Sequence, residues 1–183
     1  GSGTGLGVQP DTTGSSDVQN WFKGYKYRGA FRYQRVSGGD LTVVNVVPLG
    51  DYIKGVVPYE MSPSWPLEAL KAQAVCARTY ALSNLNKHKS YGFDICTSTD
   101  CQVYHGTNRE NSTTIAAVEE TAGVTVKYNG AYAQTVFSAS DGGATESSEN
   151  VWTEAIPYLR GVVDPYEASV ADLISNYNWT STY

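Results

Sequence analysis

The chain has 183 residues, enough for one domain with its own hydrophobic core but not for several. Hydrophobic residues make up 41%, the formal net charge is −5, and the 13 lysines and arginines are scattered singly. The composition excludes a membrane span, because no window approaches about 18 uninterrupted apolar residues. It also argues against a nucleic acid as partner, because a polyanion requires clustered positive charge.

The first residues, 1–20, are rich in Gly, Ser, Thr and Asp and contain little to bury. We expect a flexible linker or an artificial lead-in there, followed by one domain over 21–183. That domain opens with two β-prone runs, 30–36 and 41–47, separated by Ser-Gly-Gly-Asp, which predicts a β-hairpin. The next stretch, 51–57, fits either one or two helical turns or a strand.

One long helix is predicted over 65–86, because Leu and Ala recur at helical spacing and form a wide, Ala-rich apolar stripe. Ser64 is placed to cap it, and Pro66 suits its first turn. We expect this helix to be largely buried against β-strands. A shorter helix is predicted over 113–122, ending at Gly123.

Asn129-Gly130 predicts a second hairpin, because a type I′ turn requires positive φ at both central residues. Helices do not alternate regularly with strands along the chain, which argues against a doubly wound sheet. The expected fold class is therefore α+β: a single domain whose long central helix packs against antiparallel or mixed strands and hairpins.

Glu60 is the first candidate for chemistry. Its neighbours are apolar and aromatic, and no charged residue is closer in sequence than Lys54. A carboxyl group in such surroundings loses hydration, which raises its pKa and suits it to act as a general acid near neutral pH. The structural alternative is a Glu that caps the backbone N–H groups ahead of Ser64.

Lys71 and Arg78 are seven residues apart, so they share one face of the predicted long helix. They belong either to a solvated face of an amphipathic helix or to a groove, where they would donate hydrogen bonds to sugar or carboxylate oxygens. Cys76 falls within the apolar stripe of the same helix, and we expect it to be a free, buried, small hydrophobic residue.

Cys96 and Cys101 bracket the loop CTSTDC. This Cys-x4-Cys spacing allows a disulfide within the loop. It also allows two thiolates to bind Zn²⁺, with Asp100, His88 or His105 completing a set of four ligands.

Four blocks of sequence follow one another along the chain. They are VNVVPLGDYIKGVVPYEMSPSWPLEALKAQAVCARTYAL at 44–82, DICTSTDCQVYHG at 94–106, FSASDGGATESSENVW at 137–152 and PYLRGVVDPYE at 157–167. Taken together and in this order, they resemble the SpoIID/LytB family of bacterial cell-wall proteins, over about residues 25–167.

Family members of the sporulation type are lytic transglycosylases that act on peptidoglycan glycan strands, and others are described as enhancers of a cell-wall amidase. The resemblance implies cleavage of the MurNAc–GlcNAc bond by one Glu, acid then base, leaving 1,6-anhydroMurNAc ends. The alternative is a non-catalytic peptidoglycan-binding or amidase-enhancing module. The implied partners are glycan strands and a cell-wall amidase or another wall enzyme. The implied location is extracytoplasmic, with a signal or anchor outside this sequence.

The family's catalytic acid corresponds to Glu60, which is followed by Met61-Ser62-Pro63. Further positions of the family site imply a set of substrate-binding residues. These are Lys71, Arg78, Gln102, Tyr104, Ser138, Ser140 and Tyr158.

Some members bind zinc through Cys and His residues in the loop before the CQVY block. This chain has Asp100 where one His stands and Ser90 near the other, while Cys96 and Cys101 remain. The resemblance therefore favours a disulfide between the two cysteines and no metal or cofactor. Zinc at this pair is the minority alternative, and a metal-dependent hydrolase centred on it and on His88 is a third.

Overall fold

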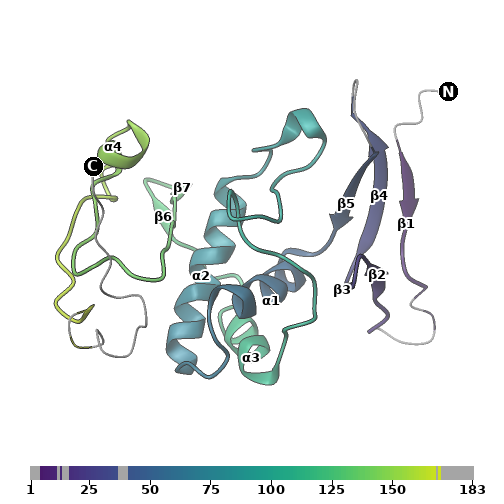
Figure 1. The fold of residues 1–183 in the computed structure, drawn as a ribbon, viewed down its shortest axis with the longest axis horizontal. Coiled ribbons are helices and arrows are strands. Elements are labelled where there is room, and N and C mark those ends of the chain that lie inside the picture. The colour runs from purple at the N-terminus through teal and green to yellow at the C-terminus, as the bar shows by residue number, and fades with distance from the viewer. Residues whose placement is uncertain (1–4, 12, 14–16, 37–40, 168, 170–183) are drawn as a thin grey trace. The chain divides into compact units, whose positions relative to one another are not determined.

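The computed structural model describes residues 5–11, 13, 17–36, 41–167 and 169 of the chain (Figure 1). Contacts within the chain divide it into two compact units, residues 1–135 and 136–183, a division that the sequence analysis did not predict. The described elements are helices and small antiparallel sheets, which confirms the α+β class. None of the described helices is long and apolar enough to cross a lipid bilayer.

The largest sheet is antiparallel and has the strand order β1-β4-β5. Its strands are β1 (Leu6–Val8), β4 (Ala30–Arg35) and β5 (Leu41–Val46). The pairing of β4 with β5 runs from Ala30 opposite Val46 to Arg35 opposite Leu41, which confirms the first predicted hairpin. A separate hairpin precedes it, formed by β2 (Asn20–Phe22) and β3 (Tyr25–Tyr27).

Strand β1 lies in the lead-in, where the sequence predicts no element. Leu6 and Val8 are both exposed, so β1 joins the sheet through its backbone pairing with β4 and adds little to the core. A strand without a buried face leaves no hydrophobic pattern in the sequence. Residues 1–4, 12 and 14–16 of the lead-in, and 170–183 of the expected domain, lie outside the described residues.

Three helices contact one another in the larger unit (Figure 1). They are α1 (Leu49–Glu60), α2 (Leu67–Ser83) and α3 (Ser112–Glu120). Helix α1 resolves the open alternative for 51–57 in favour of a helix. Helix α2 confirms the long central helix, but its N-cap is Pro66 and no side chain caps it, so the predicted cap at Ser64 is wrong.

The core of the larger unit surrounds α2. Leu70, Ala74, Ala77 and Ala81 follow one another at intervals of four, three and four residues, and all are buried. Small Ala side chains on this face allow the neighbouring helices to pack closely. The buried core side chains are Tyr27, Phe31, Tyr52, Ile53, Val56, Val57, Leu70, Ala74, Ala77, Ala81, Tyr104, Ala117 and Val118.

Helix α3 begins with a reciprocal capping box. The Asn111 side chain accepts hydrogen bonds from the N–H groups of Thr113 and Thr114, and Thr114 Oγ1 accepts one from the Asn111 N–H. The second predicted hairpin follows, with β6 (Lys127–Tyr128) and β7 (Ala131–Tyr132). Its turn has φ of 48° at Asn129 and 83° at Gly130, as the sequence predicts.

Two short helices complete the described elements. A 3₁₀ turn, η1 (Lys89–Tyr91), follows α2 in the larger unit. The smaller unit contains α4 (Ser148–Trp152), whose first residue is fully buried. The Ser148 hydroxyl donates to Glu154 O and accepts from the Ile156 N–H, and so fixes the chain that follows α4.

Candidate functional site

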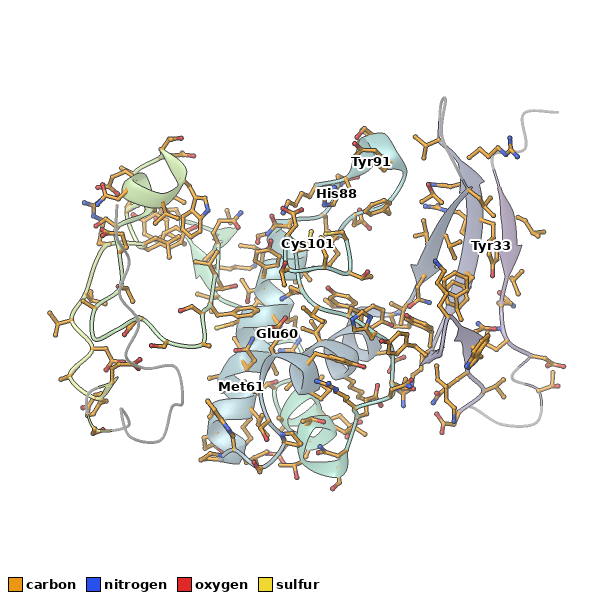
Figure 2. All side chains as sticks on the ribbon, viewed as in Figure 1. Tyr33, Glu60, Met61, His88, Tyr91 and Cys101 are labelled. Carbon is orange, nitrogen blue, oxygen red and sulfur yellow. The ribbon has the colours of Figure 1, made fainter. Side chains whose placement is uncertain are left out.

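Glu60 is the last residue of α1, beside Met61, which ends the helix (Figure 2). Its Oε1 atom accepts a hydrogen bond of 3.1 Å from the N–H of Val103, 43 residues away. The side chain therefore does not cap the chain ahead of Ser64, which was the structural alternative. Burial raises the pKa of Glu60 above its ordinary value of 4.5, and the Val103 hydrogen bond opposes this shift only in part.

Gln102 holds one side of the segment that presents Val103. Its side chain is 1% exposed, accepts a hydrogen bond from Tyr52 Oη at 3.2 Å and donates one to Ala77 O at 3.2 Å. These bonds tie the segment to α1 and α2. Gln102 therefore positions this segment, and the glycan contact that the resemblance implies stays a prediction.

Tyr104 holds the other side of the segment. Its side chain is 3% exposed, and its hydroxyl donates to Asn45 Oδ1 on β5 at 2.8 Å. The ring lies against α1 at Gly55, where an added Cβ would come within 2.6 Å of Tyr104 Cε2 and 2.7 Å of Gly106 O. Tyr104 is thus also a buried positioning residue in this structure and makes no exposed contact surface for a substrate.

A cleft of about 460 Å³ opens beside Glu60. Its walls are Pro58, Tyr59, Glu60, Met61, Ser62, Pro63 and Arg109. Among the described residues that line it, Glu60 is the one carboxylic acid and Arg109 the one permanent cation. The sequence analysis missed Arg109, because a single arginine in the polar stretch Thr-Asn-Arg-Glu carries no local signal.

Lys71 points toward carboxylates of its own unit. Its Nζ lies 2.7 Å from Glu68 on the same helix and 2.7 Å from Glu120 at the end of α3. It therefore joins α2 to α3 at the surface. Whether a substrate oxygen replaces one of these partners stays a prediction of the resemblance.

Arg78 lies on the same face of α2, also toward α3. It is 4% exposed and donates to Val118 O, Val124 O and Thr121 Oγ1 at 3.0 to 3.3 Å. The guanidinium thus satisfies carbonyl groups at the C-terminal end of α3, where a positive charge is favourable. Arg78 is therefore buried and has a structural role in this structure, and its contact with a substrate stays a prediction of the resemblance.

The remaining predicted site residues belong to the smaller unit. The Ser138 hydroxyl donates to Ser140 O at 3.2 Å, and the Ser140 hydroxyl donates to Glu167. Tyr158 is partly exposed in the same unit. Glu60 lies in the other unit, and a role of these three residues along a glycan groove stays a prediction.

The state of the cysteines differs from the predicted disulfide. All three are free, so the disulfide expected between Cys96 and Cys101 is absent. The Cys101 sulfur instead accepts from the Cys96 N–H at 3.2 Å, and Asp100 Oδ2 lies 3.7 Å and 3.8 Å from the Cys96 and Cys101 sulfurs. Cys76 is free as expected, but it is only half-buried, and this burial raises the pKa of its thiol.

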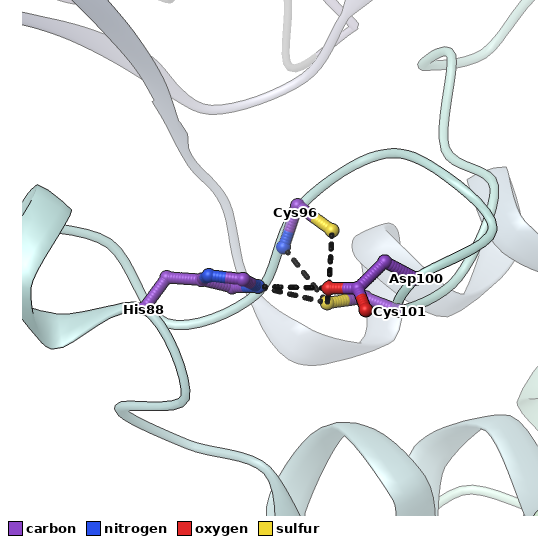
Figure 3. A group of neighbouring side chains, drawn as sticks. All are labelled: His88, Cys96, Asp100 and Cys101. Atoms are coloured by element: carbon purple, nitrogen blue, oxygen red, sulfur yellow. Dashed lines mark hydrogen bonds and ion pairs between the residues drawn. The ribbon is translucent and has the colours of Figure 1, made fainter.

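Four side chains converge in this loop (Figure 3). His88 joins Cys96, Asp100 and Cys101, and one ligand atom from each lies within 4.8 Å of all the others. His88 Nε2 is 3.2 Å from the Cys101 sulfur and 3.4 Å from Asp100 Oδ2. The edges of a zinc tetrahedron with N, O and S ligands are about 3.3–3.8 Å long, so this donor set fits zinc. His105 is not part of it, because its ring stacks on Tyr25.

Comparisons with known proteins identify the family of the chain. The family model SpoIID, Stage II sporulation protein, matches residues 37–128. The chain is 48% identical over 123 residues to an uncharacterized protein of Brachyspira hyodysenteriae. It is 42% identical over 130 residues to the Amidase enhancer of Bacillus subtilis and 34% over 139 residues to the Stage II sporulation protein D of that organism.

These matches cover 67%, 71% and 68% of this chain but only 33%, 16% and 40% of the three relatives. The chain thus spans less than half the length of each. The family match includes Glu60, the segment around Val103 and the converging cysteine loop, and it extends over half of the chain. The chain belongs to the SpoIID family of stage II sporulation proteins.

Proposed function

We propose that this domain is a peptidoglycan lytic transglycosylase that cleaves the MurNAc–GlcNAc bond with Glu60 as acid and then as base. The observation that carries the proposal is the cleft beside Glu60. It holds a carboxylic acid whose pKa is raised by burial, and no second carboxylate lines it among the described residues. Two-carboxylate glycosidases need a second acid as nucleophile or as base toward water, whereas a transglycosylase does not.

In the first step Glu60 donates a proton. The Val103 N–H occupies Oε1 and requires that oxygen to stay an acceptor, which leaves Oε2 to carry the proton. The proton passes to the glycosidic oxygen as the bond from that oxygen to MurNAc C1 breaks, and the bonding electrons remain on the oxygen. The oxocarbenium-like centre at C1 is stabilised by the N-acetyl group of the same sugar.

In the second step the Glu60 carboxylate acts as base. It takes the proton from the C6 hydroxyl of the same MurNAc as O6 bonds to C1, which closes the 1,6-anhydro ring and restores the protonated acid. One residue serves both steps, and no water is consumed. The Val103 N–H stabilises the carboxylate between the two steps.

We also propose that His88, Cys96, Asp100 and Cys101 hold a structural zinc ion. Four protein ligands leave no open coordination position, so the ion would cross-link the loop and take no part in bond cleavage. Two thiolates and one carboxylate give such a site a net charge of −1, which Lys87 offsets from 3.3 Å away at Asp100. Because Cys101 directly precedes Gln102, the ion would help to fix the segment that presents Val103 to Glu60.

Membership of the SpoIID family supports a role at the cell wall, and we expect the domain to act outside the cytoplasm on peptidoglycan strands. The similarity to a relative named Amidase enhancer supports a second candidate function. In that case the domain binds strands without cleaving them and stimulates a cell-wall amidase.

Product analysis separates these functions. Purified glycan strands are incubated with the protein, and the fragments are identified by mass spectrometry. A transglycosylase yields fragments with 1,6-anhydroMurNAc ends. Reducing ends would indicate a hydrolase, and bound but intact strands would support the module that only binds.

A further inference from the structure

The chain around Arg109 is fixed to the β2–β3 hairpin. Thr107 N–H donates to Lys26 O at 2.8 Å, and Asn108 Oδ1 accepts from the Lys26 N–H at 2.8 Å. On the other side of Arg109, Glu110 forms an ion pair with Arg28, and its side chain is nearly buried. Three neighbours of Arg109 are thus held from the hairpin side, while Arg109 itself lines the cleft beside Glu60.

The Arg109 guanidinium is held over an aromatic ring. It lies 4.5 Å from the centroid of the Tyr59 ring, which packs at a steep angle against the His105 ring with the two centroids 5.1 Å apart. A guanidinium stacked on a ring keeps its in-plane N–H donors available, and these match the two oxygens of a carboxylate. No carboxylate among the described residues lies within ion-pair distance of Arg109. The stack therefore orients an arginine whose fork of donors has no acidic partner in the described part of the chain.

Protonation of Glu60 changes the charge of the cleft. When Glu60 carries the proton that it must donate, Arg109 is the one charged side chain among the described residues that line the cleft. With Glu60 protonated the cleft carries a positive charge, and it favours a ligand that brings a negative charge close to the bond to be cleaved.

We propose that Arg109 is a specificity-determining residue that binds a carboxylate of the glycan strand in the cleft beside Glu60. The proposal rests on the function proposed above and adds the chemical group that the site selects. Two sources on the polymer carry this group. One is the lactyl carboxylate of a muramic acid without a peptide, and the other is a carboxylate of an attached stem peptide.

The test measures binding in the Glu60→Gln background, in which strands are not consumed. Three fluorescently labelled ligands are compared: peptide-free strands, peptide-free strands whose lactyl carboxylates are converted to methylamides, and strands with intact stem peptides. The variants are Arg109→Ala and Arg109→Lys. Arg35→Ala is the matched control, because Arg35 is an exposed arginine on β4 that does not line the cleft.

For a lactyl carboxylate, Arg109→Ala weakens binding of the peptide-free strands about tenfold to a hundredfold, as for loss of a hydrogen bond to a charged group. The methylamide strands then bind equally to the parent and the variant. For a stem-peptide carboxylate, the loss occurs only with peptide-bearing strands. In both cases Arg109→Lys restores part of the affinity, because lysine keeps the positive charge but lacks the paired N–H donors of the guanidinium. Arg35→Ala has no effect, because Arg35 does not line the cleft.

Equal affinity of parent and Arg109→Ala for all three ligands would overturn the proposal. So would an equal loss for all three, since a role in packing alone does not distinguish charged from amidated strands. The proposal would also be overturned if none of the three ligands bound the parent. If Arg109→Ala weakens binding only of strands that carry the carboxylate, but the wild-type protein forms no anhydro ends, the carboxylate site stands and the transglycosylase function fails.

Discussion

Two opposing effects set the protonation of Glu60. Partial burial in a wall of Tyr59, Met61 and prolines disfavours the charged carboxylate, and the hydrogen bond from the Val103 N–H favours it. Burial is the larger effect, so the pKa lies above the ordinary value. The raised pKa favours the protonated acid needed for the first step, and the Val103 N–H stabilises the carboxylate that acts as base in the second.

This shift predicts how pH affects stability. Because the pKa of Glu60 is higher in the folded than in the unfolded chain, the folded state binds more protons between the two values, and its stability falls as pH rises across that window. We expect the free energy of unfolding of the wild type, relative to Glu60→Gln, to be highest below pH 4.5 and to decrease above it. Urea unfolding of both proteins at acidic and neutral pH measures this. A difference that grows with pH would contradict the burial of Glu60.

At the scale of elements, the site depends on how α1 meets the segment 102–104. Helix α1 carries Glu60 at its end, and the segment supplies the Val103 N–H. Two buried side chains, Gln102 and Tyr104, flank Val103 and anchor it to other elements. The register between helix and segment is therefore fixed by packing on both sides of the one contact that Glu60 uses.

Gly55→Ala tests this register. Alanine normally stabilises a helix interior relative to glycine, but here the new Cβ would lie 2.6 Å from the Tyr104 ring. We expect a loss of about 1–3 kcal/mol of stability from overpacking, together with a lower kcat. The control is Gly50→Ala in the same helix, where a Cβ meets nothing within 4 Å. If Gly55→Ala matches this control in urea unfolding and in rate, the packing described here does not position Glu60.

The cysteine loop makes a second prediction at this scale. The purified protein should contain one zinc ion per chain by elemental analysis, and chelation should lower its melting temperature. His88→Ala should lose the metal, whereas His105→Ala should keep it, because only His88 faces the sulfurs. A metal-free protein with Cys96 and Cys101 joined in a disulfide would restore the original prediction and refute the zinc site.

At the scale of the whole molecule, the sequence predicts what periodicity and turn chemistry encode. Helix α2, the hairpin at Asn129-Gly130 and the α+β class were predictable for this reason. The sequence did not distinguish a helix from a strand over 51–57, because Gly55 and Pro58 both disfavour a helix interior. The reason for a glycine at position 55 is the close approach of the Tyr104 ring, which comes from a residue 49 positions further along the chain.

The site was predictable to a smaller extent. The apolar setting of Glu60 is visible locally, but its partner Val103 and its cleft neighbour Arg109 come from distant sequence. Arg78 and Gln102 show what local sequence does not reveal, namely which groups each side chain contacts in the folded chain. Tertiary packing turns their hydrogen-bonding groups toward buried protein groups. Likewise, a disulfide was predicted for the cysteine pair with zinc as the minority alternative, and spacing alone did not show that His88, rather than His105, lies beside the two sulfurs.

The most direct test of the central claim is the rate at which Glu60→Gln releases fragments with 1,6-anhydro ends. Gln keeps the shape and can still accept the Val103 hydrogen bond, but it cannot donate or take up the migrating proton. We predict a fall of at least about 10²–10⁴-fold, with strand binding and folding retained. Glu119→Gln, which changes an exposed carboxylate paired with Lys54, should keep the wild-type rate. Wild-type release of anhydro-ended fragments by Glu60→Gln would contradict the mechanism.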